Sequence, residues 1–109
     1  MAAKRKPITG NGLGVGLKKS RSFTRVIRGV LSKTRAIEAV YLFTDDANVV
    51  HVFSVAREFR SSLYDDLLKK ERAIGRGFPE IAFEFHVRAH QGRPPAEAVP
   101  FDAELVFAR

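Results

Sequence analysis

Residues 37–56, IEAVYLFTDDANVVHVFSVA, decide the fold class, because two runs rich in β-branched and aromatic residues flank a short polar segment. Ile37–Phe43 and Val49–Ala56 are predicted as strands, and Thr44–Asn48 has the residue types of a turn. A polar interval this short favours an antiparallel hairpin. The second strand carries apolar side chains on both faces, which predicts a central position in the sheet.

Helical periodicity precedes and follows this hairpin. Upstream, an apolar stripe begins at Phe23 with the spacing i, i+3, i+4, i+7 and i+8, and Ser22 is its predicted N-cap. Downstream, residues 61–65 have the Ser-x-x-Asp spacing of a capping box. Gly75, Gly77 and Pro79 predict the end of this second helix. Its buried side is predicted to consist of Tyr64, Leu67, Leu68 and Ile74.

Two further strands complete the pattern. Ile81–Ala89 is the third, and Phe101–Phe107, where apolar and acidic residues alternate, is the fourth. The predicted order is α-β-β-α-β-β, which gives an α+β two-layer sandwich: a small mixed sheet with two helices on one face. The second helix is then the crossover between parallel second and third strands.

The length of 109 residues suits a single α+β domain, predicted over residues 21–109, preceded by a flexible, basic, glycine-rich arm over residues 1–20. The alternating glycines of the arm lack the strand and helix that frame a nucleotide-binding loop. The chain contains no cysteine, which excludes disulfides and thiolate zinc sites. No apolar run is long enough to span a bilayer, so we expect a cytoplasmic protein without membrane contact.

Positive charge is concentrated at the N-terminal end. Residues 1–35 hold ten Lys or Arg and no acid, whereas residues 36–109 hold nine Lys or Arg and twelve acids, a net charge of −3. This asymmetry predicts an anionic partner, nucleic acid or an acidic protein. A solubilising tail is the alternative. The residues expected to contact the anion are Lys4, Arg5, Lys6, Lys18, Lys19, Arg21, Arg25 and Arg28.

The stretch FEFHVRAHQGR, residues 83–93, holds two of the three histidines. In a strand His86 and His90 are ~13 Å apart, so they cannot share one zinc ion. Alternation predicts Glu84, His86, Arg88 and His90 on the face opposite the apolar side chains. We expect a hydrogen-bonded His51 and a solvated His86. The alternative is that His51 approaches His86 from a neighbouring strand, with Glu84 or another acid completing a metal site.

The order helix, strand, strand, helix, strand, with VVHVFSVA at 49–56, Glu71 in the helical run 66–74 and GFPEIAFEFHV at 77–87, resembles the soluble C-terminal domain of cation diffusion facilitators. The resemblance covers roughly residues 23–90. It implies a metallochaperone-like domain that dimerises and binds zinc or related ions through strand histidines. By position, His51 and His86 would be the ligands.

No serine lies in the strained turn of a hydrolytic nucleophile, and the adjacent Asp45 and Asp46 suit a hairpin turn. We therefore expect a non-enzymatic, homodimeric binding module without a cofactor, whose basic arm engages an anionic partner. The alternative is a metal-responsive dimerisation domain that binds a divalent cation through His51 and His86. A small enzyme acting through the same polar face is a third hypothesis.

Overall fold

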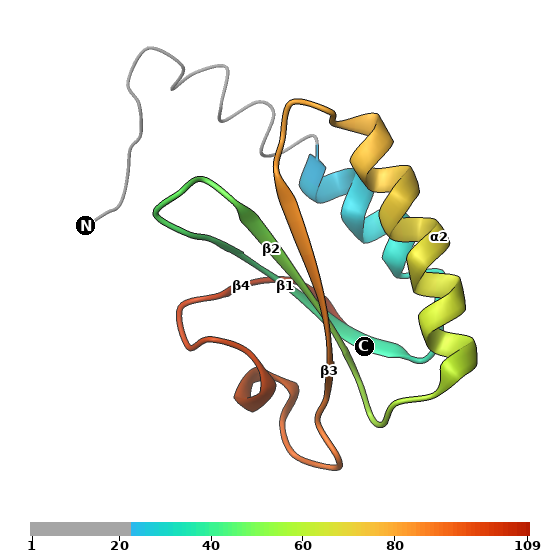
Figure 1. The fold of residues 1–109 in the computed structure, drawn as a ribbon. Coiled ribbons are helices and arrows are strands. Elements are labelled where there is room, and N and C mark those ends of the chain that lie inside the picture. The colour runs from blue at the N-terminus through green and yellow to red at the C-terminus, as the bar shows by residue number, and fades with distance from the viewer. Residues whose placement is uncertain (1–22) are drawn as a thin grey trace.

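The computed structural model describes residues 23–109 (Figure 1). Helix α1 is described over residues 23–31, and the element order is α1-β1-β2-α2-β3-β4, which confirms the predicted α+β class. A short 3₁₀ helix, η2, lies between the last two strands. The remaining elements are β1 (Ile37–Thr44), β2 (Val50–Ala56), α2 (Ser61–Gly77), β3 (Phe83–Ala89), η2 (Pro95–Ala98) and β4 (Glu104–Ala108).

The four strands form one mixed sheet in the order β3-β2-β1-β4. β1 is antiparallel to both β2 and β4, whereas β2 and β3 are parallel. The predicted hairpin and the predicted crossover through α2 are therefore confirmed. β2 has a neighbour on each side, as its two apolar faces indicate.

Both helices pack on the same face of the sheet (Figure 1). The strand register aligns Leu42, Val52 and Phe85 across three strands on this face. Ile27 of α1 and Leu67 of α2 are almost fully buried against them. Burying a side chain of this size stabilises the fold by roughly 1.5–3 kcal/mol, so the helix face of the sheet holds the main core.

Helix α2 is turned differently from the prediction. Tyr64 and Leu68 are 43% and 47% exposed, while Leu63, Leu67 and Ile74 are buried. Leu63 therefore replaces Tyr64 and Leu68 in the buried stripe, while Leu67 and Ile74 stay in it, so the stripe is turned by roughly half of the 100° between successive residues. The N-cap residue is Arg60, with no side-chain capping bond, so the predicted capping box was also wrong. The predicted N-cap Ser22 lies outside the described residues.

Strand ends also differ from the predictions. β3 begins at Phe83, two residues later than predicted. β4 begins at Glu104, which pairs with Leu42 of β1. Phe101 therefore lies in the preceding turn and is 99% exposed. In α1, the buried residues Phe23, Ile27 and Leu31 follow the predicted stripe. Val26, which was also predicted in the stripe, is 38% exposed.

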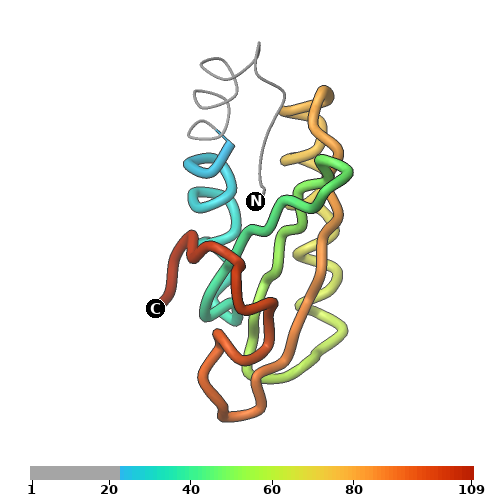
Figure 2. The backbone as a smooth tube through the Cα atoms, turned by 90° about the vertical axis from the view of Figure 1, so that its left-hand side faces the viewer, coloured from blue at the N-terminus to red at the C-terminus, as the bar shows by residue number. Residues whose placement is uncertain are grey.

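The sheet face opposite the helices is called the open face below. The connection from β3 to β4, with η2, runs across one end of this face (Figure 2). Val55 at that end has no exposed surface, whereas His51 at the other end is partly exposed. The open face is therefore the side of the sheet on which polar strand residues remain accessible. Within residues 23–109, no helix is long and apolar enough to cross a membrane.

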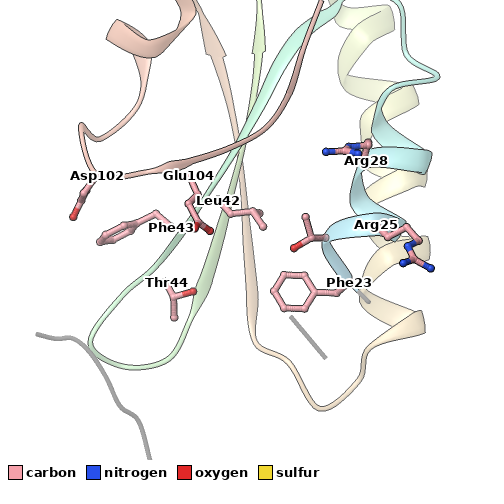
Figure 3. A pocket seen from close by; sticks show the side chains of 9 residues that line it. Phe23, Arg25, Arg28, Leu42, Phe43, Thr44, Asp102 and Glu104 are labelled. Carbon is pink, nitrogen blue, oxygen red and sulfur yellow. The ribbon is translucent and has the colours of Figure 1, made fainter. Parts of the chain in front are cut away.

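A cavity of about 700 Å³ lies beside the end of β1 (Figure 3). The pairing of β1 with β4 stops at Leu42, so Phe43 and Thr44 have no β4 partner. Helix α1 forms the opposite wall. The cavity is thus a consequence of β4 being shorter than β1.

Candidate metal site

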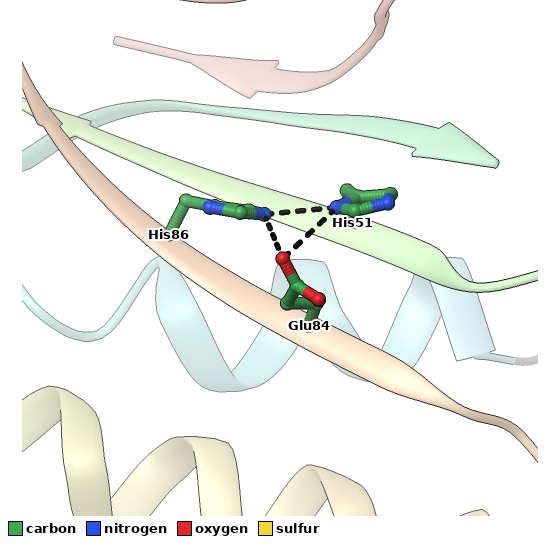
Figure 4. A group of neighbouring side chains, drawn as sticks. All are labelled: His51, Glu84 and His86. Carbon is green, nitrogen blue, oxygen red and sulfur yellow. Dashed lines mark hydrogen bonds and ion pairs between the residues drawn. The ribbon is translucent and has the colours of Figure 1, made fainter. Parts of the chain in front are cut away.

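Three side chains from the parallel pair β2 and β3 converge on the open face: His51, Glu84 and His86 (Figure 4). The register pairs His51 with Glu84 and Phe53 with His86. Partners in a parallel ladder project from the same face, and residues two apart along a strand do so as well. The sequence alternation and the strand register are together sufficient to bring the three groups side by side.

The distances in this cluster suit a single small cation. His51 Nδ1 lies 2.9 Å from His86 Nε2. Glu84 Oε1 lies 3.7 Å from the first nitrogen and 3.5 Å from the second. Zinc with N and O ligands at ~2.0–2.1 Å in tetrahedral geometry separates its ligand atoms by ~3.3 Å. The three observed separations bracket that value, so small side-chain rotations suffice to place one ion among them.

No second cluster of this kind occurs in the described part of the chain. Among residues 23–109, no other group of three or more His, Cys, Asp or Glu side chains places its ligand atoms this close together. The side chains of His51 and His86 are 16% and 20% exposed, and that of Glu84 is 60% exposed. An ion can therefore enter directly from the open face.

Asp45, in the turn between β1 and β2, orients His51. Its Oδ2 lies 2.7 Å from His51 Nε2, and its Oδ1 accepts backbone N–H bonds from Ala47 and Val49 at 2.8 and 3.0 Å. The His51 bond, followed by the Val49 bond, lowers the pKa of Asp45. An ionised carboxylate only accepts hydrogen bonds, so Nε2 carries the hydrogen of the neutral ring. The lone pair of Nδ1 then faces Glu84 and His86, as metal coordination requires.

His86 is held in a form that suits a ligand. Burial, then the charges of Arg88 and His51, lower its pKa, while the charge of Glu84 raises it less. The ring is therefore neutral near pH 7. It stacks on Phe53 with ring centroids 4.6 Å apart, which fixes its plane. Without an ion, its Nε2–H donates to His51 Nδ1; an ion at Nε2 requires that hydrogen to move to Nδ1.

The structure brings His51 next to His86, the arrangement that the sequence left as the alternative, and Glu84 lies within 4 Å of both rings. The prediction that His90 shares the solvated face was wrong. β3 ends at Ala89, and His90 is only 7% exposed. Its Nε2 donates to Glu38 at 2.6 Å and its Nδ1 accepts the N–H of Gly92 at 2.9 Å, so this histidine closes a turn.

The role of Asp45 was missed, because the sequence pattern indicated only a turn residue at this position. The signal lies in the hairpin register. Phe43 pairs with His51, and alternation puts residues 43 and 45 on one face. Asp45 is therefore diagonal to His51, a relationship that becomes visible only once the pairing is known.

Most of the predicted anion-binding residues, Lys4, Arg5, Lys6, Lys18, Lys19 and Arg21, lie outside the described part of the chain. Arg25 and Arg28 lie on α1, and both are exposed. Arg28 also has a structural contact, because its Nε and Nη2 donate to the carbonyl oxygen of Val106 at 3.3 and 3.0 Å. Its guanidinium therefore ties α1 to β4.

No protein-family model, curated protein or solved structure shows significant similarity to this chain.

Proposed function

We propose that this protein binds a divalent transition-metal ion, with zinc as the best-fitting candidate, through His51, Glu84 and His86. The observation that carries the proposal is the convergence of two imidazole nitrogens and one carboxylate oxygen at separations of 2.9, 3.5 and 3.7 Å. Imidazole and carboxylate ligands suit zinc and neighbouring first-row ions. Asp45 supports the set from behind His51, as outer carboxylates do at many histidine metal sites.

The ligand count indicates an open coordination position. Structural zinc sites use four protein ligands, whereas three ligands leave a position for water or another small molecule. The exposed carboxylate of Glu84 also lets the ion exchange with solvent. Binding that varies with ion concentration suits a metal-responsive domain better than a permanently loaded one.

The test is a zinc titration by calorimetry on the full chain. His51→Ala, His86→Ala and Glu84→Gln are compared with the unmodified protein, and Glu97→Gln, an exposed acid on η2, is the matched control for Glu84. We expect affinity to fall at least 10-fold in each ligand variant and to be unchanged in the control. Equal affinities in all five proteins would exclude the proposed site.

A second candidate function rests on the charge distribution. The ten basic residues of segment 1–35, set against a body of net charge −3, favour attraction of a polyanion such as nucleic acid. A polyanion titration at two salt concentrations, with and without residues 1–20, tests it. Strongly salt-dependent binding that disappears on deletion supports this function, and weak binding that survives deletion counts against it.

Self-association belongs to the same proposal. Leu105 of β4 is 57% exposed, and Phe43 is partly exposed on the open face. Sedimentation velocity with and without zinc measures whether two copies associate and whether the ion controls the step. A monomer under both conditions at high protein concentration would remove the dimer from the proposal.

A further inference from the structure

The edge of β3 that points away from β2, called the free edge below, is suited to pair with another strand. β3 and β4 lie at opposite margins of the sheet (Figure 2). β4 has five residues, and its register on β1 shifts between Val40 and Tyr41. β3 has seven residues, contains no proline and pairs with β2 without a register shift. Short length, proline and bulges each hinder pairing at a strand edge, and β3 has none of these three features.

The hydrogen bonds to β2 show which backbone groups of β3 remain unpaired at the free edge. At one end of the pair, Val50 N donates to Ala82 O at 2.8 Å, and at the other end His90 N donates to Ala56 O at 2.9 Å. The backbone groups of successive strand residues point to opposite sides, so the even-numbered residues of β3 bond to β2. The N–H and C=O groups that point to the free edge are those of Phe83, Phe85, Val87 and Ala89.

The sequence of β3, FEFHVRA, is complementary to itself in one antiparallel register. With His86 opposite the partner's His86, all four outward-pointing residues have hydrogen-bonding partners in the other strand. Glu84 then lies opposite the partner's Arg88, and Arg88 lies opposite the partner's Glu84. Opposite charges at facing positions stabilise a strand pair. A register shifted by two residues in either direction loses both charge pairs and shortens the overlap of the strands by two residues.

Both charged side chains of β3 are accessible to a partner. The Glu84 side chain is 60% exposed, and its Oε1 faces the two imidazoles, which leaves Oε2 for another group. Arg88 is exposed, and its guanidinium lies 5.3 Å from the centre of the Phe53 ring. Among residues 23–109, no acid forms an ion pair of 4.0 Å or less with this guanidinium. Pairing with a second copy therefore breaks no ion pair of Arg88 within the described chain.

The two helices lie over different parts of the sheet, α1 toward β4 and α2 toward β3 (Figure 2). Arg28 of α1 donates to the carbonyl oxygen of Val106 in β4, as this arrangement requires. Thr34, in the turn after α1, bonds to Asp66 of α2, so this flank of α2 faces α1. The opposite flank of α2, called the outer flank below, is therefore on the same side of the molecule as the free edge.

The outer flank of α2 carries exposed apolar side chains. Leu68 lies about 100° from the buried Leu67, on the side away from Asp66, and Tyr64 lies one turn before Leu68. Tyr64 and Leu68 are 43% and 47% exposed. Phe59, which is 52% exposed, stacks on Tyr64 with ring centroids 5.9 Å apart. A contiguous exposed apolar patch of this kind marks an interaction surface, and a second copy paired at the free edge brings its own α2 beside it.

We propose that two copies of this chain associate through the free edges of β3, antiparallel and with the two His86 residues opposite each other, to form one continuous sheet. The outer flanks of the two α2 helices face each other across the same two-fold axis. The inference rests on the self-association included in the proposed function, for which it names the interface, and it needs no bound ion. Because His86 lies at the axis, the two metal sites of the dimer are neighbours.

The first experiment reverses the charges in the full chain and measures the dimer dissociation constant by sedimentation equilibrium, with a chelator present so that Glu84 holds no ion. Glu84→Arg or Arg88→Glu alone places like charges opposite each other, and each should weaken the dimer at least 10-fold. The double variant and an equimolar mixture of the two single variants restore opposite charges at both positions. Both should therefore recover the affinity of the unmodified protein.

Glu97→Arg, at an exposed acid on η2, is the control for the charge reversals and should leave the dissociation constant unchanged. Circular dichroism establishes that each variant is folded. If folded single variants dimerise normally, or if neither the double variant nor the mixture recovers the dimer, the proposed register is wrong.

The second experiment keeps both charges and uses the absence of cysteine from the chain. His86→Cys introduces one thiol at the proposed axis, where facing Cα atoms are ~4.5 Å apart, within the range of a disulfide. We expect a covalent dimer on oxidation in the presence of a chelator. Leu105→Cys, at a 57% exposed position on β4, is the control and should stay without a crosslink.

The possible failures of this experiment are distinguishable. A disulfide at position 105 but not at 86 would mean that the copies associate through the open face. A dimer in sedimentation that is crosslinked at neither position would place the interface elsewhere. Either result would overturn the β3 interface but keep the homodimer. A monomer at every protein concentration would remove the homodimer too, while the zinc titration of the unmodified chain tests the metal site independently.

Discussion

Asp45 Oδ2 lies 2.7 Å from His51 Nε2, and the same carboxylate accepts two backbone N–H bonds in the β1–β2 turn. The turn and the candidate metal site therefore share one side chain. Whatever alters the carboxylate alters the orientation of the imidazole.

Asp45→Asn is expected to weaken zinc binding roughly 10- to 100-fold, the usual effect of losing a carboxylate that hydrogen-bonds to a metal-binding histidine. If the amide oxygen stays on the turn, its NH₂ faces His51 Nε2 and donates to it. The ring hydrogen then moves to Nδ1, which blocks the ligand lone pair. Calorimetry measures the affinity. The neighbouring Asp46→Asn, an exposed turn residue, is the control and should bind zinc normally; equal losses in both variants would point to turn damage instead.

The contribution of His86 to the pH dependence of zinc affinity should set in below about 6.5, the ordinary histidine pKa. The reason is that the folded protein lowers the pKa of His86, first by burial and then by the charge of Arg88. The ring therefore gains its competing proton at a lower pH than a free histidine does. NMR titration of the His86 ring follows this directly.

Arg88→Gln removes one of the charges that oppose protonation of His86, so the pKa of this ring should rise. The loss of zinc affinity should then begin at a higher pH than in the unmodified protein. Arg72→Gln, an exposed arginine on α2, is the control with an unchanged profile. A shift to lower pH in the Arg88 variant would contradict the assigned cause.

His90→Leu should destabilise the fold without altering zinc affinity. The buried ring links Glu38 to the N–H of Gly92, and its removal leaves both groups without this partner. A typical hydrogen bond contributes ~0.5–1.5 kcal/mol to stability, and Glu38 and Gly92, both exposed to solvent, can bond to water once the ring is gone. Urea unfolding gives the loss in free energy of unfolding, and a zinc titration on the same variant separates His90 from the metal ligands. A reduced zinc affinity in a folded His90→Leu protein would contradict this separation.

Leu67→Ala should lower the free energy of unfolding by about 2–5 kcal/mol, because Leu67 is 1% exposed and its truncation leaves a cavity. Leu68→Ala, the same change one residue along α2 at a 47% exposed side chain, should cost about 0.5 kcal/mol or less. Chemical denaturation of the two variants tests the orientation of α2. Similar losses would mean that the helix is rotated toward the face that the sequence pattern favoured.

The sequence predicted the order of elements, because the hairpin at residues 37–56 and the helical stripe from Phe23 are strong local periodicities. It also raised the pairing of His51 with His86 as an alternative, since alternation puts each of them on one face of its own strand. It could not supply the register that adds Asp45, because register depends on hydrogen bonds between strands. Nor could it show that β3 ends at Ala89. Because His90 lies beyond the strand, its side chain is buried against Glu38 instead of lying on the open face.

The parallel pairing of His51 with Glu84 brings together two points separated by the whole of α2. An ion held there would act as a removable crosslink that closes this loop, and such a closure restricts the unfolded chain. β3 is an edge strand whose only neighbour in the sheet is β2. The ion would therefore add a second link between β3 and β2, beside their hydrogen bonds. Zinc should therefore slow hydrogen exchange most in β3, with little change in β4 at the opposite edge. If hydrogen exchange slowed equally in β3 and β4, the ion would stabilise the domain as a whole rather than β3 alone.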